Sequence, residues 1–288
     1  MPRKKKIPAP SQTMSFAEYQ GVVGVNWSSL KWLRVSPKHY EHHLRQPPED
    51  RASLMAGRAF HTAVLEPDRF PIDYAVFTGP ARRGEEWEAF KAANAGRTIL
   101  KETEYAEALA IRDSVRAHRK ASRILTGGLP EQTLVWIDPT TKIVCKGRVD
   151  YLRPDGFVDL KRTTSRTFDL RRFGAVAHDY GYHLQAAFYR RGIASLAGIS
   201  TADVRAWVVG VEGSAPFDVG LFPWDPEALG AADWELDQLL AKLAECRKRK
   251  KWPGRYEDET TLTLPAWAYQ SEEADEAALG LNIGGQAA

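Results

Sequence analysis

The stretch CKGRVDYLRPDGFVDLK, from Cys145 to Lys161, decides the fold of this 288-residue chain. Two runs rich in Val, Leu and aromatic residues flank Pro-Asp-Gly, which is typical of a turn between antiparallel strands. Side chains of a strand alternate between its two faces, so Asp159 and Lys161 share one face while Leu160 lies on the other. The stretch therefore predicts a β-hairpin whose second strand carries Asp and Lys on one face.

The length of the hairpin loop determines whether two carboxylates meet. If residues 153–156 form a four-residue loop, Asp150 faces Asp159 across the hairpin and Arg148 faces Lys161. Opposed like charges have Cβ atoms only about 4.5–5.5 Å apart and are unfavourable unless something neutralises them. The natural partner is Mg²⁺ or Mn²⁺, because both ions prefer oxygen ligands. A three-residue loop with a Gly bulge would instead send the two Asp side chains to opposite faces. A further alternative is a solvent-facing hairpin whose Asp and Lys side chains form only surface ion pairs.

Around this hairpin, hydrophobic periodicity and capping residues predict helices first and mixed elements afterwards. Helices are predicted at residues 27–46 (two short ones), 53–65, 85–95, 103–123, 182–196 and 226–250, and strands at 132–137, 143–152, 157–161, 204–211 and 218–222. This order indicates an α/β fold with a helical N-terminal part.

The chain is predicted to contain one domain between two tails. Residues 1–22 are basic and residues 271–288 are acidic and then Gly/Ala-rich, so both are expected to be flexible. The domain itself is predicted to cover residues 23–270, with a helical part at 27–125 and a core at 130–255.

Composition excludes several classes of protein. The 10% of aromatic residues, including nine Trp, argues against intrinsic disorder, and no apolar run is long enough for a membrane span. The N-terminus has no apolar segment typical of a secretory signal, and two cysteines cannot form a disulfide framework or a four-thiolate cluster. We therefore expect a cytoplasmic protein.

The net charge of +3, from 40 basic and 37 acidic residues, conceals an uneven distribution. Residues 3–6 carry +4 and the acidic residues at 272–276 carry −4, so the two ends cancel. Between them, residues 160–172 carry a local +4 and residues 247–251 an unbroken +5. Such runs usually form a solvated surface. Because they are local, however, the small net charge does not argue against a nucleic-acid partner.

Other single residues give weak signals when each is taken alone. His61 lies in the middle of a predicted helix, Gln185 and Tyr189 share one face of another, and Glu131 precedes the first strand of the hairpin region. An isolated residue of each kind more often packs in the core or forms surface pairs than takes part in chemistry.

Taken together, these residues resemble the PD-(D/E)XK nuclease superfamily, and within it the RecE-type (exonuclease VIII) branch related to the RecB nuclease domain. The motifs that carry the resemblance are GRAFH at 57–61, GRVD at 147–150, VDLK at 158–161 and QAAFY at 185–189. The resemblance covers roughly residues 27–267, and Asp159 stands where many members have Glu. It implies a restriction-endonuclease-like α/β core with a central mixed β-sheet flanked by helices.

The resemblance also implies a role for each motif residue. His61, Asp150 and Asp159 would bind one or two Mg²⁺ or Mn²⁺ ions, and the Leu160 carbonyl would be a further ligand.

Lys161 would be the catalytic lysine, Gln185 and Tyr189 would position it or the DNA strand, and Glu131 would be an additional acidic residue near a second metal. The basic segment after Asp159 is expected to contact DNA through Arg162, Arg166, Arg171 and Arg172.

The implied activity is that of a metal-dependent exodeoxyribonuclease. Members of the RecE type degrade linear double-stranded DNA from an end, 5′ to 3′, and leave 3′ overhangs for phage-type recombination. Their partners would be a single-strand annealing protein and further copies of the chain in a ring. Two alternatives remain: a structure-specific endonuclease of the same superfamily, and a non-catalytic DNA-binding protein on the same fold. The sequence contains no phosphate-binding loop of the GxxxxGK[ST] type, which argues against an enzyme acting on small phosphate compounds.

Overall fold

The computed structural model describes residues 14–46, 52–79, 81–265 and 268, and side chains within 52–56 are not described. The chain divides into two compact units, Met1–Trp252 and Pro253–Ala288. Every element named below lies in the first unit. The predicted single domain at 23–270 runs across the boundary between the units, and its predicted end lies outside the described residues.

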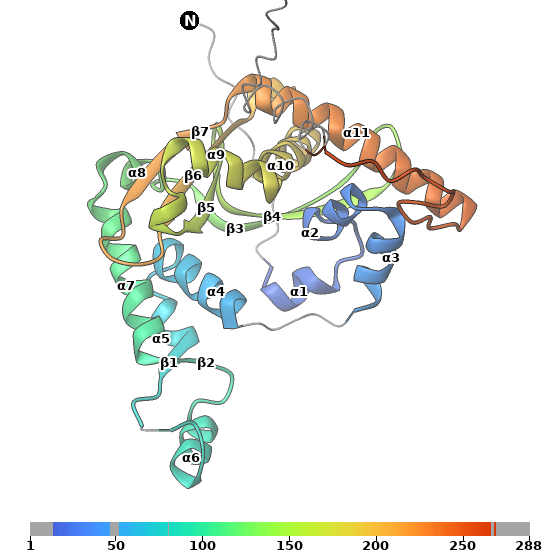
Figure 1. Cartoon of the computed structure of the whole chain (residues 1–288). Helices are drawn as coiled ribbons and strands as arrows, with labels where there is room; N and C mark the ends of the chain where they lie inside the picture. The colour runs from blue at the N-terminus through green and yellow to red at the C-terminus, as the bar shows by residue number, and fades with distance from the viewer. Residues whose placement is uncertain (1–13, 47–51, 80, 266–267, 269–288) are drawn as a thin grey trace, which may run out of the picture. The chain divides into compact units, whose positions relative to one another are not determined.

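The helices are concentrated in the N-terminal part of the chain and the strands of the main sheet follow them, as Figure 1 shows. They are α1 (Phe16–Gly21), α2 (Trp27–Leu30), η1 (Lys31–Arg34), α3 (Pro37–Arg45), α4 (Ala52–Leu65), α5 (Phe70–Asp73), β1 (Tyr74–Val76), α6 (Glu85–Ala93), β2 (Thr98–Leu100), α7 (Glu102–Ala117), α8 (Arg119–Ile124), β3 (Leu129–Ile137), β4 (Val144–Arg153), β5 (Gly156–Thr163), η2 (Ser165–Thr167), α9 (Leu170–Asp179), α10 (Tyr182–Ala197), η3 (Thr201–Asp203), β6 (Arg205–Glu212), β7 (Val219–Pro223) and α11 (Pro226–Arg249).

A five-stranded mixed sheet of order β3-β4-β5-β6-β7 forms the centre of the first unit. The β5–β6 pair is parallel and the other three pairs are antiparallel. A short parallel pair, β1–β2, lies apart from it. This arrangement confirms the predicted α/β fold with a central mixed sheet and a helical N-terminal part.

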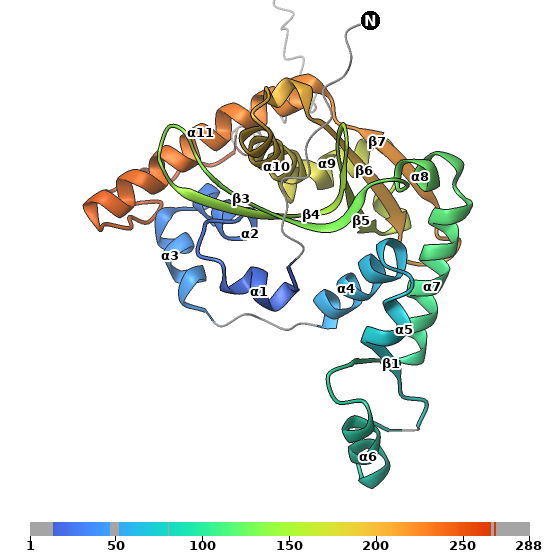
Figure 2. The ribbon, with the colours of Figure 1, turned by 180° about the vertical axis from the view of Figure 1, so that it is seen from behind.

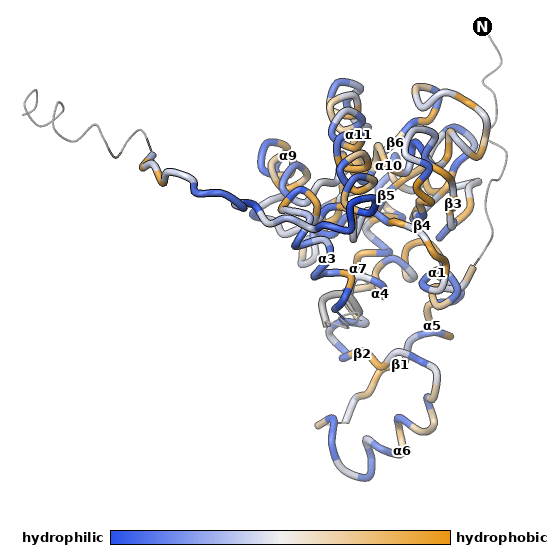
Figure 3. The backbone as a smooth tube through the Cα atoms, turned by 90° about the vertical axis from the view of Figure 1, so that its right-hand side faces the viewer, coloured by the Kyte–Doolittle hydropathy of each residue, from blue (hydrophilic) through white to orange (hydrophobic). Residues whose placement is uncertain are grey.

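Helices cover both faces of this sheet (Figures 1 and 2). One hydrophobic core joins α10, α11 and α2 to the face that carries Trp136, Val149 and Phe157. A second core joins α4, α7 and α8 to the opposite face, through Val158 and Leu160. Figure 3 shows that the hydrophobic segments are concentrated where the strands and α10 pack together. The alternation predicted for β5 is therefore confirmed.

The hairpin register agrees with the four-residue spacing, although the ladder is shorter than predicted. Leu152 pairs with Phe157, as that spacing requires, and one further pair closes the ladder next to a two-residue turn at 154–155. The pairing ends at Tyr151, so Asp150 and Asp159 are not partners in the ladder, and Arg148 is not opposite Lys161. The two strands separate at this point because the Asp150 carboxylate accepts a hydrogen bond from the Leu160 backbone N–H at 2.7 Å.

The structure differs from the sequence prediction within the expected N-terminal tail. Residues 16–21 form α1, which begins with a capping box between Ser15 and Glu18 and buries Tyr19. The ammonium of buried Lys146 donates hydrogen bonds to the carbonyls of Tyr19, Gln20 and Val22, at 3.0, 3.3 and 2.7 Å. Because these carbonyls lie at the end of a helix, a cation there is doubly favourable. Lys146 therefore attaches this helix to β4.

Several smaller features of the fold were not predicted. The helix expected at 103–123 is divided, because His118 ends α7 and its ring caps the first turn of α8. The short elements α5, β1, β2 and α9 also lie outside the predicted set. Each spans ten residues or fewer, which is too short for a hydrophobic period to be recognised with certainty in the sequence.

We expect Lys146→Met to loosen α1, because it keeps the apolar stem and removes the donor for three carbonyls. Leaving such groups unsatisfied costs about 1–3 kcal/mol, so the free energy of unfolding in urea should fall by that order. Lys242→Met, at an exposed position in α11, is the control and should change it by less than about 0.5 kcal/mol. Equal effects of the two substitutions would contradict this role.

Candidate active site

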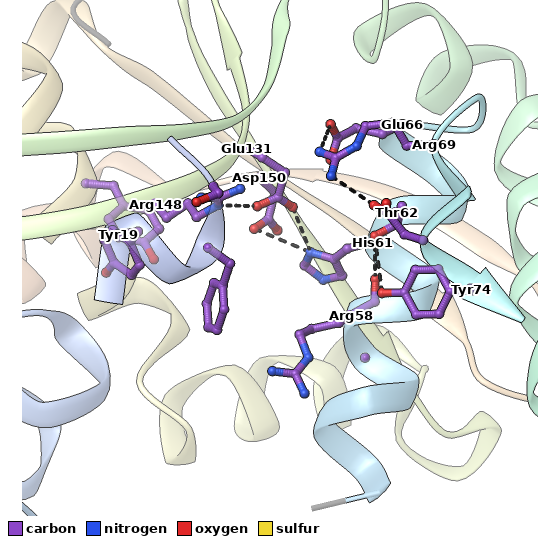
Figure 4. A pocket seen from close by; sticks show the side chains of 15 residues that line it. Tyr19, Arg58, His61, Thr62, Glu66, Arg69, Tyr74, Glu131, Arg148 and Asp150 are labelled. Atoms are coloured by element: carbon purple, nitrogen blue, oxygen red, sulfur yellow. Dashed lines mark hydrogen bonds and ion pairs between the residues drawn. The ribbon is translucent and has the colours of Figure 1, made fainter. Parts of the chain in front are cut away.

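A cavity of about 490 Å³ opens where α1, α4, β3 and β4 meet. Its wall includes His61 from α4, Glu131 from β3 and Asp150 from β4, and these three side chains point toward one another in Figure 4. The aromatic residues Phe16 and Tyr19 of α1 line it as well. The cavity therefore brings together residues that are far apart in sequence.

His61, Glu131 and Asp150 form a cluster in which one potential ligand atom from each lies within 4.8 Å of the others. The His61 Nδ1 lies 3.5 Å from the Asp150 carboxylate and 3.9 Å from the Glu131 carboxylate. Arg148 donates a hydrogen bond to the other Glu131 oxygen at 2.6 Å and so fixes that side chain from behind. The cluster can offer one nitrogen and several carboxylate oxygens to a cation.

The local backbone directs both acids out of the sheet. Pairing between β3 and β4 is continuous except opposite Glu131, which has a left-handed φ of 52° and no Cα partner in the ladder. This conformation is unfavourable for a non-glycine residue, by about 1–3 kcal/mol, and such strain is typical of functional sites. Asp150 is the residue that a continuous ladder would place opposite it. The interruption therefore lets the Glu131 and Asp150 side chains turn toward α4.

A second group lies on the α10 side of the same strands. The Lys161 ammonium forms an ion pair with Asp159 and donates a hydrogen bond to the Gln185 carbonyl oxygen at 3.0 Å. The Gln185 amide in turn donates to the Tyr189 hydroxyl at 3.0 Å. A chain of contacts thus runs from Asp159 through Lys161 and Gln185 to Tyr189. It fixes the position of the ammonium between β5 and α10.

The glycine of the GRVD motif makes room for the end of this chain. A Cβ atom at Gly147 would lie 2.8 Å from the Tyr189 ring, closer than real side-chain contacts allow. A side chain at this position would displace Tyr189, and with it the hydrogen bond to Gln185. This close approach accounts for glycine three residues before Asp150.

Burial and charge shift the titration of the residues at the strand fork. Burial raises the pKa of Asp150 to about 7, against the opposing effect of His61, and the nearby charge of Asp159 adds to the rise. Burial also disfavours the Lys161 ammonium, but the carboxylates of Asp159 and Asp150 outweigh it and raise the pKa of Lys161. Lys161 is therefore a cation at neutral pH.

The two remaining members of the cluster shift in opposite directions. Burial opposes protonation of His61, yet Asp150 and Glu131 raise its pKa overall. Burial raises the pKa of Glu131, but the contacts with His61 and Arg148 lower it by more, so the pKa of Glu131 decreases overall. Because metal ligands must be deprotonated, a cation here would displace the protons that Asp150 and His61 hold.

These residues fit a divalent cation. Asp159 Oδ1 is buried and has no hydrogen-bond partner among the described residues, and an unsatisfied buried carboxylate oxygen is costly without a compensating charge. Asp150 and Glu131 supply further hard oxygen ligands, and His61 supplies an imidazole nitrogen, a set that suits Mg²⁺ or Mn²⁺. The three-residue cluster contains Glu131 and not the predicted ligand Asp159. Asp159 precedes Leu160, whose backbone N–H donates to the Asp150 carboxylate.

The structure brings most of the sequence-predicted site together. His61, Glu131, Asp150, Asp159, Lys161, Gln185 and Tyr189 all lie around the point where β4 and β5 separate. The Leu160 carbonyl stays a prediction as a metal ligand, while the Leu160 N–H has the structural role described above.

The four predicted DNA-binding arginines are not gathered in one place. The Arg162 guanidinium is bound to Glu107 of α7 and to the Gly213 carbonyl, away from Lys161. Arg166, Arg171 and Arg172 are exposed around α9, and Arg172 pairs with Asp169. Their contacts with DNA stay a prediction.

The sequence prediction missed the supporting residues of the cavity. Arg148, which fixes Glu131, was assigned to the hairpin face, and α1 was assigned to the tail. The Ser15-x-x-Glu18 capping box is the one signal that indicates α1 from sequence. Arg58 lies within the GRAFH motif, but the motif does not indicate that its guanidinium lies over the Phe16 ring, at 5.7 Å.

Comparison with known proteins places this geometry in a family. Residues 26–262 match the model of a family described as "PDDEXK-like domain of unknown function (DUF3799)". The chain belongs to this family. It is a member of the PD-(D/E)XK superfamily, as the motifs indicated, whereas nothing in the comparison identifies the RecE type.

A solved structure supports the same fold. The crystal structure of a protein named "Putative exonuclease" from Eubacterium rectale superposes with a TM-score of 0.57 at 13% identity, over 88% of this chain and 96% of that one. No curated protein matches the chain. Within the described part of the chain, no helix has the length and apolar character needed to span a membrane.

We expect Asp150 to make the stability of the metal-free protein depend on pH. Its pKa rises from 3.8 to about 7 on folding, so the folded state holds the proton more tightly and the free energy of unfolding falls as pH increases between these values. Asp150→Asn removes this contribution. In urea denaturation with EDTA, wild-type protein should therefore lose more stability than Asp150→Asn between pH 5 and pH 8.

Asp113→Asn provides the matched control. Asp113 is exposed and its pKa is lowered by Arg112, so this variant should follow the wild type over the same pH range. Parallel curves for wild type and Asp150→Asn would show that Asp150 is not buried as described.

Proposed function

We propose that this protein is a metal-dependent nuclease that hydrolyses phosphodiester bonds of DNA. The observation that supports this most strongly is the convergence of Asp150, Asp159 and Lys161 at the fork of β4 and β5. The two acids are nearly buried, with side chains 13% and 7% exposed, and the lysine beside them is held as a cation. Such an arrangement suits a negatively charged substrate and a divalent cation together.

In this proposal His61, Glu131, Asp150 and Asp159 hold the metal. A divalent cation, when bound, supplies Lewis-acid stabilisation of phosphate charge and lowers the pKa of water. The protein supplies the position and electrostatics of the reaction. Lys161 presents its ammonium toward the phosphate, where it stabilises the charge that develops in the transition state.

Gln185 and Tyr189 act as positioning residues for Lys161. The ammonium carries three donors, of which Asp159 and Gln185 engage two. The remaining donor can then serve a phosphate oxygen without rotation of the side chain. Because the Gln185 amide is itself oriented by Tyr189, this pre-organisation reduces the entropy lost when substrate binds.

For the substrate we propose linear double-stranded DNA, degraded from an end, 5′ to 3′, with 3′ overhangs left for phage-type recombination. The resemblance of the four motifs to RecE-type proteins supports this. The name "Putative exonuclease" of the Eubacterium rectale protein supports only degradation from an end. A single-strand annealing protein and a ring of identical subunits are the partners that the same resemblance implies. The reaction would take place in the cytoplasm, where linear DNA intermediates of recombination occur.

We expect the protein with Mg²⁺ to degrade linear duplex DNA and to release a 5′-terminal label before a 3′-terminal label, leaving covalently closed circles intact. Gel analysis of the three substrates side by side tests this. Cleavage of the closed circle would favour the structure-specific endonuclease, and binding without cleavage would favour the non-catalytic DNA-binding protein.

The same assay with variants tests the assignment of residues. Lys161→Ala and Asp150→Ala should lose at least about 10²–10³-fold of the cleavage rate, while Lys242→Ala, exposed on α11, should retain it. Full activity of either site variant, with an unchanged fold by circular dichroism, would overturn the assignment.

A further inference from the structure

Two tyrosines stack on each other at the turn between α9 and α10. The rings of Tyr180 and Tyr182 lie 5.8 Å apart, with 22° between their planes. Tyr180 is 63% exposed, so the outer side of the pair is accessible from solvent. Neither hydroxyl forms a hydrogen bond within the described part of the chain, so ring contacts alone account for their placement.

The turn holds the two rings in a fixed position. Gly181, between them, adopts a left-handed conformation with a φ of 68°, and a Cβ atom there would lie 2.6 Å from the Trp27 ring. Glycine is thus required both by the backbone and by the contact with α2. Because Trp27 is buried, the α9–α10 turn is attached firmly to the core.

The tyrosine pair continues directly from the proposed catalytic lysine. The Lys161 ammonium lies 4.7 Å from the centre of the Tyr182 ring. From the inside outward, the order is therefore Lys161, whose side chain is 14% exposed, then half-buried Tyr182, then exposed Tyr180. A strand whose phosphate contacts Lys161 would carry its neighbouring bases past these rings.

The charge around the turn also suits a nucleic acid. Lys31 of η1 is a further cation in this region: burial lowers its pKa, and the charge of the Lys161 ammonium lowers it further. Neighbouring cations are stabilised by an anion beside them. A phosphodiester backbone provides such charges at regular intervals.

We propose that the exposed Tyr180 ring, supported from behind by Tyr182, forms a stacking platform for a nucleobase of the strand whose phosphate contacts Lys161. This site rests on the proposed nuclease function and specifies how the enzyme holds its strand. Recognition would be independent of sequence, because every base has a π-face and the exposed Tyr180 ring offers a face for contact. The ligand is thus a strand of nucleic acid with at least one unpaired or unstacked base.

We expect Tyr180→Leu to raise the KM for cleavage of a short linear duplex about tenfold, as the loss of one stacked base implies, and to leave kcat within twofold. Tyr180→Phe should behave as the wild type, since it keeps the ring. The control is Trp234→Leu, at an exposed aromatic position on α11, which should change neither constant. Tyr180 is exposed, so thermal melting should be the same for all variants.

Substrates with a single abasic nucleotide identify the stacked base. A series of duplexes carries the abasic nucleotide at each of the first six or so positions from the cleaved end. At one position, removing the base should raise the KM of the wild type to that of Tyr180→Leu and have no further effect on the variant. Such non-additivity shows that ring and base contact each other.

The outcomes separate this inference from the proposed function. Equal KM values for wild type, Tyr180→Phe and Tyr180→Leu, with normal DNA cleavage, would overturn the platform alone. An equal increase in KM for Tyr180→Phe and Tyr180→Leu would also overturn it. So would an increase in KM for Tyr180→Leu that stays the same at every abasic position. If the wild type neither binds nor cleaves DNA, the proposed function fails and the platform fails with it.

Discussion

The hydrogen bond from the Leu160 N–H to the Asp150 carboxylate is the interaction on which the site depends. It lies where the β4–β5 ladder stops and ties the Asp150 side chain to the neighbouring strand. Without it, Asp150 would have no fixed relation to Asp159 and Lys161, which flank Leu160. The sheet thus uses one backbone donor to place two acids and a lysine within electrostatic reach of one another. The helices on both faces bury most of the Asp150 and Asp159 side chains, so these charges interact more strongly than they would in water.

This closeness has an electrostatic cost that the chain itself offsets only in part. Lys161 neutralises one Asp159 oxygen, while the other is buried without a hydrogen bond among the described residues. Asp150 retains its proton up to about pH 7 because burial disfavours its charge. A protein selected only for stability would replace such groups with apolar ones. Their presence is explained if a divalent cation and a phosphate complete the charge balance.

Periodicity and turn chemistry predicted the elements that build the sheet and its mixed order with helices, and they offered the observed register near the hairpin turn as one of two alternatives. They could not predict that the ladder would end before Asp150, because this depends on a side chain of one strand binding the backbone of the next. The motifs identified the site residues that carry chemistry, but they indicated no role for Arg148, although it lies within GRVD, or for Lys146. Both residues act through contacts distant in sequence. Tyr182 was also missed, since its relation to Lys161 arises only when α10 crosses the sheet. Local patterns thus predicted what each segment is, and tertiary contacts decided what the segments do together.

The central claim is that the fork between β4 and β5 is a divalent metal site. The most direct measurement is anomalous X-ray diffraction from crystals of the protein soaked in Mn²⁺. The account predicts a strong anomalous peak in contact with the Asp150 carboxylate and beside Asp159 or the His61–Glu131 pair. A second peak within the same cluster would indicate two ions. Absence of any peak at the fork at millimolar Mn²⁺, or peaks confined to surface acids elsewhere, would contradict the account.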